Sequence, residues 1–235
     1  MPERGVKTRQ SFFSLIGLTV RLTLRRWALY SAAALVAFGV QAAAAFLWRS
    51  PVGIEVSSDV ALPLLTALVY ARVWGDSNEN ITSQAVWERF LERAWAVIVI
   101  DFFVSWLFER AFVFGAAPTM LQQIGAVLAY TLVLFIIFAD AGATIDDGVT
   151  VWNVIPLSLL RSVLVTLNPI TFARALALFF LNVIVVFGQF TLYSALAHSH
   201  APQALFWSTV PLATVAQLPL AALTLLVYQD AKPVG

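Results

Sequence analysis

The chain has 235 residues, of which 60% are hydrophobic and only 11% are charged, and it contains no cysteine. A soluble domain carries about 25% charged residues, so this composition indicates a protein whose apolar surface faces lipid. We expect no nucleic-acid partner. The lack of cysteine excludes disulfides, thiolate metal sites and thiol nucleophiles.

Six segments are long and apolar enough to cross a membrane as helices. About 20 apolar residues cover the roughly 30 Å of hydrocarbon, and WALYSAAALVAFGVQAAAAFLW is the clearest example. The sequence therefore predicts an all-α integral membrane protein, with a single membrane domain over residues 1–235. The expected spans are about 27–48, 57–74, 94–114, 119–139, 172–196 and 204–228.

The basic residues favour one orientation of these spans. With the N-terminus in the cytoplasm, twelve of the 14 Lys and Arg residues lie in inner segments, and only Arg49 and Arg110 lie outside. Such a bias predicts that both termini are cytoplasmic. The stretch 149–167 is long enough for a seventh span, but Asn153, Pro156 and the short gap before the next span favour a helix at the inner surface over 150–167.

Three amphipathic helices are expected at the membrane surface, each preceding a pair of spans. The first covers residues 10–26, and the other two cover 82–93 and 150–167 on the cytoplasmic side. The first helix is basic, and we expect contact between anionic lipid headgroups and Arg21, Arg25 and Arg26. The alternative is a basic flank that only sets the orientation.

An acidic turn, a glycine and a helix ending in Arg161-Ser162 make up the segment FADAGATIDDGVTVWNVIPLSLLRS (138–162). Together with PLAALTLLVYQD (219–230), this segment resembles the membrane domain of bacterial glycerophosphodiester phosphodiesterases and its stand-alone six-span relatives. No catalytic domain of that enzyme accompanies it. The resemblance therefore implies a helical module of the bacterial cytoplasmic membrane, and carries no enzymatic activity over.

Asp101 is the one acidic residue deep within an expected span. An ionised carboxylate at the bilayer centre costs about 2.5–3.5 kcal/mol on insertion scales, so it needs polar partners or a wet cavity. The functional interpretation is a proton or cation relay; the alternative is a protonated or hydrogen-bonded contact between helices. Candidate partners at membrane depth are Asn182, Gln189, Gln41 and Gln217.

A polar vestibule is a further possibility on the outer side. Only about 22 Å of helix separates Arg93 from Glu109, so charges near the outer end of that span can lie inside the membrane. The candidate vestibule residues are Arg49, Glu55, Asp59, Glu109 and Arg110. The alternative is a set of ordinary charges at headgroup level.

Enzyme and cofactor signatures are absent from the sequence. His198 and His200 fall in an expected outer loop without further nearby ligands, and no phosphate-binding loop, HExxH or nucleophile elbow occurs. We therefore expect no catalytic residues, no metal and no cofactor.

Two functions remain open on this basis. The first is a non-enzymatic accessory or scaffolding subunit, or a lipid-contacting module, which binds another membrane protein or forms a homo-oligomer through its alanine-rich first span. The second is a small transporter or substrate-binding membrane component that uses Asp101.

Overall fold

A computed structural model describes residues 10–48, 51–78, 81–115, 119–148, 150, 152–196 and 201–232. Side chains are described in these ranges except at 48, 51–58, 108–115, 190, 193, 201–206, 208 and 209. Every regular element in the described part of the chain is a helix, which confirms the all-α class. The helices are α1 (Phe12–Arg25), α2 (Trp27–Trp48), α3 (Pro51–Asp76), α4 (Ser83–Gly115), α5 (Met120–Ile136), α6 (Ala139–Ile145), α7 (Val154–Thr166), α8 (Pro169–Leu196) and α9 (Ala201–Ala231).

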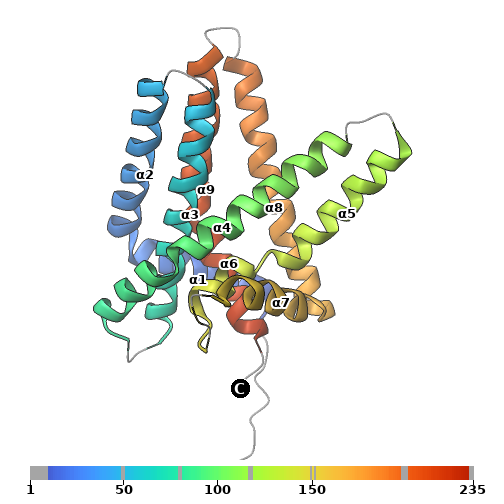
Figure 1. Ribbon diagram of the computed structural model, residues 1–235. Coiled ribbons are helices and arrows are strands. Elements are labelled where there is room, and N and C mark those ends of the chain that lie inside the picture. The colour runs from blue at the N-terminus through green and yellow to red at the C-terminus, as the bar shows by residue number, and fades with distance from the viewer. Residues whose placement is uncertain are drawn as a thin grey trace, which may run out of the picture.

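The long helices form a bundle with one divergent arm. Helices α2, α3, α8 and α9 run side by side, while the α4–α5 hairpin leans away from them (Figure 1). Tyr70 of α3, Phe138 before α6 and Tyr228 of α9 are at most 2% exposed and belong to one apolar core. Helices α1 and α7 lie across one end of the bundle, near the C-terminus (Figure 1).

Four stretches are long and apolar enough to cross a membrane: Trp27–Leu47, Met120–Ile145, Pro169–Leu196 and Val210–Ala231. Helices α3 and α4 are also long, with 26 and 33 residues, but both contain several charged residues. Large apolar side chains remain exposed on α2, α5 and α8, as expected of surfaces that face lipid. The structure thus supports a multi-pass membrane protein, while the full count of six spans goes beyond these four stretches.

The expected surface helix 82–93 and the expected span 94–114 are one continuous helix, α4, of 33 residues. The sequence prediction of two elements was wrong here. No proline or glycine interrupts the helix between Ser83 and Phe114, so nothing breaks its hydrogen-bond ladder where the polar segment meets the apolar one.

The expected span 119–139 is interrupted near its end, where α5 stops at Ile136 and α6 begins at Ala139. The hydroxyl of Ser162, on α7, compensates for this break. Its Oγ accepts a hydrogen bond from the Phe138 N–H at 3.1 Å and donates one to the Phe135 carbonyl at 2.8 Å. Backbone groups freed by the break are therefore satisfied although they are buried.

Helix α7 has 13 residues, so its length of about 20 Å is too short to span the hydrocarbon core. It packs mainly against α6 and α5, and its buried residues include the small polar residues Ser158, Ser162 and Thr166. Its opposite face exposes Leu160 and Leu164. The length of α7 thus argues against a seventh span, while its place at the membrane surface stays a prediction.

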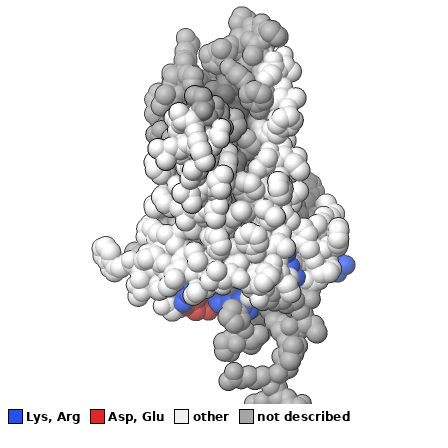
Figure 2. Space-filling view, turned by 90° about the vertical axis from the view of Figure 1, so that its right-hand side faces the viewer, with Lys and Arg blue, Asp and Glu red and all other residues white. Residues whose placement is uncertain are grey.

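Charged side chains gather at the end where α1 and α7 lie, which we call the charged end (Figure 2). The buried acids of this region all have cationic partners. Asp230 pairs with Arg174 at 2.7 Å, with both side chains at most 7% exposed. Asp76 pairs with Arg26 at 2.9 Å and with Arg72 at 2.6 Å.

The ion pair between Asp76 and Arg26 changes the pKa values of both residues. Burial opposes ionisation of Asp76, but the hydrogen bonds from Arg26 and Arg72 outweigh it and hold the pKa of Asp76 below its ordinary value. The hydrogen bond to Asp76 in turn raises the pKa of Arg26. This ion pair ties the start of α2 to the end of α3.

Candidate functional site

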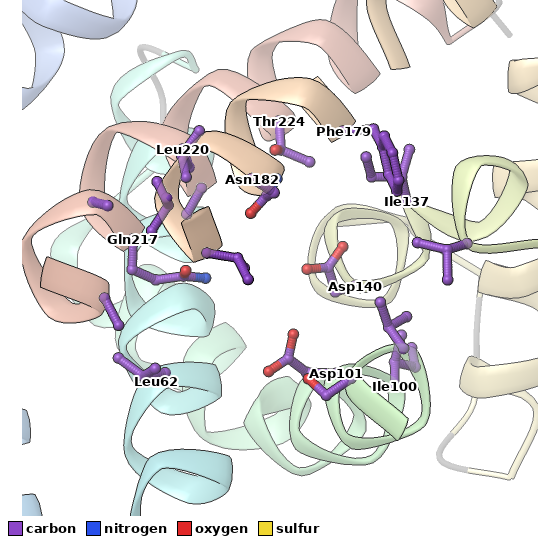
Figure 3. A pocket seen from close by; sticks show the side chains of 18 of the residues that line it. Leu62, Ile100, Asp101, Ile137, Asp140, Phe179, Asn182, Gln217, Leu220 and Thr224 are labelled. Atoms are coloured by element: carbon purple, nitrogen blue, oxygen red, sulfur yellow. The ribbon is translucent and has the colours of Figure 1, made fainter. Parts of the chain in front are cut away.

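A cavity of about 450 Å³ lies between the α4–α5 hairpin and the α8–α9 pair. Its walls come from α3, α4, α5, α6, α8 and α9, so residues from most of the chain meet there (Figure 3). The volume falls within the roughly 300–1,000 Å³ of small-molecule sites. The polar side chains in its lining are Tyr70, Asp101, Ser105, Asp140, Asn182, Gln189, Gln217 and Thr224.

Asp101 points into this cavity from α4 (Figure 3). Its carboxylate forms no hydrogen bond within the described part of the chain, and it interacts electrostatically with two other acids, Asp140 and Asp59. The interhelical hydrogen bond considered from the sequence is therefore not formed. Asp101 is instead an acceptor that faces open space.

Asp140 is the acidic cavity residue that sequence reasoning missed, together with the hydroxyl residues Tyr70, Ser105 and Thr224. It stands in the first turn of α6 and points toward the same space as Asp101 (Figure 3). Its Oδ2 accepts a hydrogen bond from the Tyr70 hydroxyl at 2.9 Å, and its Oδ1 accepts one from the Ala141 N–H at 2.8 Å. Asp140 directly follows an apolar run in the sequence. That position predicted the end of a span and not a residue of a cavity.

Three of the four amides expected near Asp101 also line the cavity. Asn182 and Gln217 point into it from α8 and α9, and Gln189 is a further lining residue of α8 (Figure 3). The Asn182 amide donates to the Leu178 carbonyl at 3.0 Å, and the Gln217 amide donates to the Thr66 hydroxyl. Both side chains are held in place by these bonds while bordering the open space.

Gln41 lies elsewhere. It is fully buried between α2 and α9, where its amide donates to the Ala37 carbonyl at 3.2 Å and approaches the Thr214 hydroxyl at 3.5 Å. Gln41 is therefore a packing residue of the α2–α9 contact and does not belong to the cavity.

The cavity combines acids, amides and hydroxyls with apolar walls. Val104, Val133, Ile136, Ile137 and Phe179 contribute apolar surface. Among the described residues that line it, none is Lys, Arg or His. The described part of the chain also holds no group of three or more His, Cys, Asp or Glu residues suited to a metal ion.

Most of the expected outer vestibule cannot be placed. Arg49 lies outside the described residues, as do His198 and His200, and the side chains of Glu55, Glu109 and Arg110 are not described. Asp59 is described, and it lies on α3 close enough to Asp101 for electrostatic interaction.

The expected headgroup contacts divide into two kinds. Arg21 and Arg25 are exposed on α1, beside an exposed apolar stripe of Phe13, Val20 and Leu24. Arg26 instead pairs with Asp76. The arrangement of α1 is suited to lipid contact through Arg21 and Arg25, whereas Arg26 has an intramolecular role.

A second polar cluster surrounds Asp146, which is fully buried. Its carboxylate accepts a hydrogen bond from the Tyr228 hydroxyl at 2.7 Å and pairs with Arg161 at 2.9 Å and Lys232 at 2.5 Å. A Cβ at Gly142 would lie 3.1 Å from the Tyr228 hydroxyl, so α6 and α9 are in close contact here. Both carboxylate oxygens of Asp146 thus have partners, and the cluster links α6, α7 and α9.

No family model, curated protein or solved structure matches this chain.

Proposed function

We propose that this protein is a six-span membrane protein whose cavity binds a small solute, as a transporter or the substrate-binding component of one. The single observation that carries this proposal is the convergence of Asp101, Asp140, Asn182 and Gln217 on one cavity of about 450 Å³. Packing alone gives no reason to direct several polar side chains at open space. Intramembrane acids of this kind commonly mark a substrate or ion path.

In this proposal, α3 and α4 cross the membrane together with the four more apolar stretches. Their polar residues support that assignment, because Tyr70 and Asp101 face the cavity rather than lipid. The charged end would lie at the cytoplasmic surface of a bacterial inner membrane, with both termini inside, since Lys and Arg side chains favour that side.

The test is the access of water to the cavity. The chain has no native cysteine, so an Ala216→Cys variant carries a single thiol in the cavity wall, and a Val215→Cys variant carries one on the adjacent, 67% exposed position of α9. Both are treated in bilayer vesicles with 2-hydroxyethyl methanethiosulfonate, a small neutral reagent that reacts with solvated thiolates.

We expect fast labelling of Ala216→Cys and slow labelling of Val215→Cys, because a thiol in lipid is not ionised. Equal, slow labelling of both variants would mean that the cavity is dry, and would overturn the proposal. Size-exclusion profiles of both variants confirm that they are folded.

Association through α2 is a second candidate function, and it corresponds to the accessory or scaffolding subunit. In the described part of the chain, helix α2 packs mainly against α3 and α9 and also contacts α1, and it exposes the small residues Ala32, Gly39 and Ala43. A Cβ at Gly39 would meet nothing within 4 Å. Such a surface allows close approach of another helix, and spontaneous disulfide dimers of a Gly39→Cys variant would support it.

The resemblance to the membrane domain of glycerophosphodiester phosphodiesterases stays a proposal. Asp146, Arg161 and Tyr228, which belong to the two segments on which it was based, form one cluster in this protein. A shared helical scaffold is the only property that this resemblance suggests.

A further inference from the structure

Five described acids fall into two groups according to their partners. The side chains of Asp76, Asp146 and Asp230 are at most 6% exposed, and each is paired with at least one Arg or Lys. The cavity acids, Asp101 and Asp140, have no basic residue among the described residues of the lining. Their negative charge is therefore not balanced from within the cavity wall.

We propose that the cavity binds an organic ammonium ion, with its cationic group between Asp101 and Asp140 and its apolar body against the wall that includes Phe179. This inference rests on the proposed function and names the class of its ligand.

The charge of the cavity selects for a cation. Two carboxylates that point toward one space in a medium of low dielectric repel each other and attract a positive group more strongly than they would in water. Asp101 accepts no hydrogen bond within the described part of the chain, so an N–H donor can bind it without displacing a protein partner. A phosphate or carboxylate ligand would meet repulsion and no compensating base.

The size and the walls select for an organic cation rather than a metal ion. A volume of about 450 Å³ compares with the roughly 30 Å³ that one water occupies in the liquid, so a bare ion would leave most of the cavity unfilled. The lining also has an apolar part that includes Val133 and Ile136, and Ile137 lies beside Phe179 (Figure 3). An aromatic face also attracts an ammonium group.

The side-chain amides of Asn182 and Gln217 can bind a polar group of the ligand at the end away from its ammonium group. Asn182 points into the cavity from the side opposite Asp101, and Gln217 points in from the side opposite Asp140 (Figure 3). Their own hydrogen bonds fix their orientation. A ligand with a hydroxyl or carbonyl group at its far end would be bound at both ends.

The experiment compares two reagents of similar size and opposite charge on the Ala216→Cys variant in bilayer vesicles. One is 2-trimethylammonioethyl methanethiosulfonate, itself an organic ammonium ion, and the other is 2-sulfonatoethyl methanethiosulfonate. The ratio of their rates is divided by the same ratio for a free thiol in solution, which cancels intrinsic reactivity and the ionisation of the thiol. A Gln84→Cys variant, exposed at the start of α4, reports the ratio outside the cavity.

We expect the normalised ratio to be at least tenfold higher at Ala216→Cys than at Gln84→Cys. Adding Asp101→Asn should lower it several-fold, whereas adding Asp147→Asn, which removes an 82% exposed carboxylate, should leave it unchanged. In a second measurement that needs no acid substitution, 2-phenylethylammonium should slow labelling at Ala216→Cys, and its neutral analogue 2-phenylethanol should not.

Each negative result has its own meaning. Labelling by both reagents without preference for the cation, or equal protection by the amine and the alcohol, would overturn the ammonium inference and leave a solute-binding cavity in place. No labelling by either reagent would overturn the proposed function, because the cavity would then be closed to water.

Discussion

At the scale of single residues, the partners of each acid separate structural from functional roles. Asp230 is bound by Arg174 and accepts a hydrogen bond from the Gln10 N–H, so every charge in that group is compensated. Asp101 has the opposite surroundings, because it faces open space and two other acids. A carboxylate in such surroundings is stabilised by a bound ligand, by a proton or by water in the cavity.

This contrast predicts opposite responses to the same substitution. Asp230→Asn leaves the 7% exposed Arg174 side chain without its counter-ion and should cost about 3–5 kcal/mol of stability. Asp101→Asn removes repulsion and breaks no hydrogen bond, so the unfolding midpoint in detergent should stay the same or rise. A large loss of stability in Asp101→Asn would instead assign Asp101 to packing.

The acid dependence of stability should report on Asp76. Its pKa is lowered in the folded protein, so it contributes stability that is complete above the ordinary Asp pKa of about 4 and is lost as the pH falls through the folded pKa. The stability difference between wild type and Asp76→Asn should therefore be constant near neutral pH and shrink below about pH 4. Thermal unfolding between pH 3 and 7 measures it; a difference that does not depend on pH would contradict this role.

At the scale of elements, the break between α5 and α6 determines where Asp140 points. Ser162 holds this break from another helix by bonding Phe138 and Phe135. Residues 136–139 include no proline or glycine, so the local sequence does not predict the break in the helix. Asp101, Asn182 and Gln217 could be predicted because they are polar within apolar runs, whereas Asp140 depends on a contact between distant segments.

Ser162→Ala tests this dependence. The substitution leaves the buried Phe138 N–H without an acceptor, which should cost about 1–3 kcal/mol. Ser158→Ala is a matched control one turn earlier on α7, because the buried Ser158 hydroxyl has no hydrogen-bond partner in the described part of the chain. Unfolding midpoints should fall in the first variant and stay or rise in the second; equal midpoints would contradict the account of the break.

The prediction of α4 as two elements failed for a related reason. The polar-to-apolar boundary near Arg93 suggested a chain that turns from the surface into the membrane. Side-chain polarity does not interrupt a helix when every residue is a permitted helix former, and α4 continues through it.

At the scale of the whole molecule, polarity is arranged along the length of the bundle. The charged side chains gather at the charged end, where α1 lies (Figures 1 and 2). Along the rest of their length, the long helices expose apolar side chains. The positive-inside rule predicts that the charged end faces the cytoplasm. Composition and periodicity sufficed to predict the membrane class and most helices, because hydrophobic length is a local property. The cavity depends instead on how residues of α3, α4, α5, α6, α8 and α9 are brought around one space, which is a property of the tertiary structure.

The orientation can be measured with the same single-cysteine approach. Gln84 is exposed at the start of α4, at the charged end. A Gln84→Cys variant should resist a membrane-impermeant maleimide in intact cells or spheroplasts and react in inside-out vesicles. Labelling from the outside would reverse the orientation that the basic residues predict.

The central claim is that the cavity holds a solute. The most direct measurement is native mass spectrometry of the protein gently purified from its own membranes, with the Asp101→Asn variant beside it. We predict that wild type releases a small organic cation that the variant lacks. A wild-type protein that carries no small molecule and co-purifies stoichiometrically with another membrane protein would contradict this account and favour an accessory subunit.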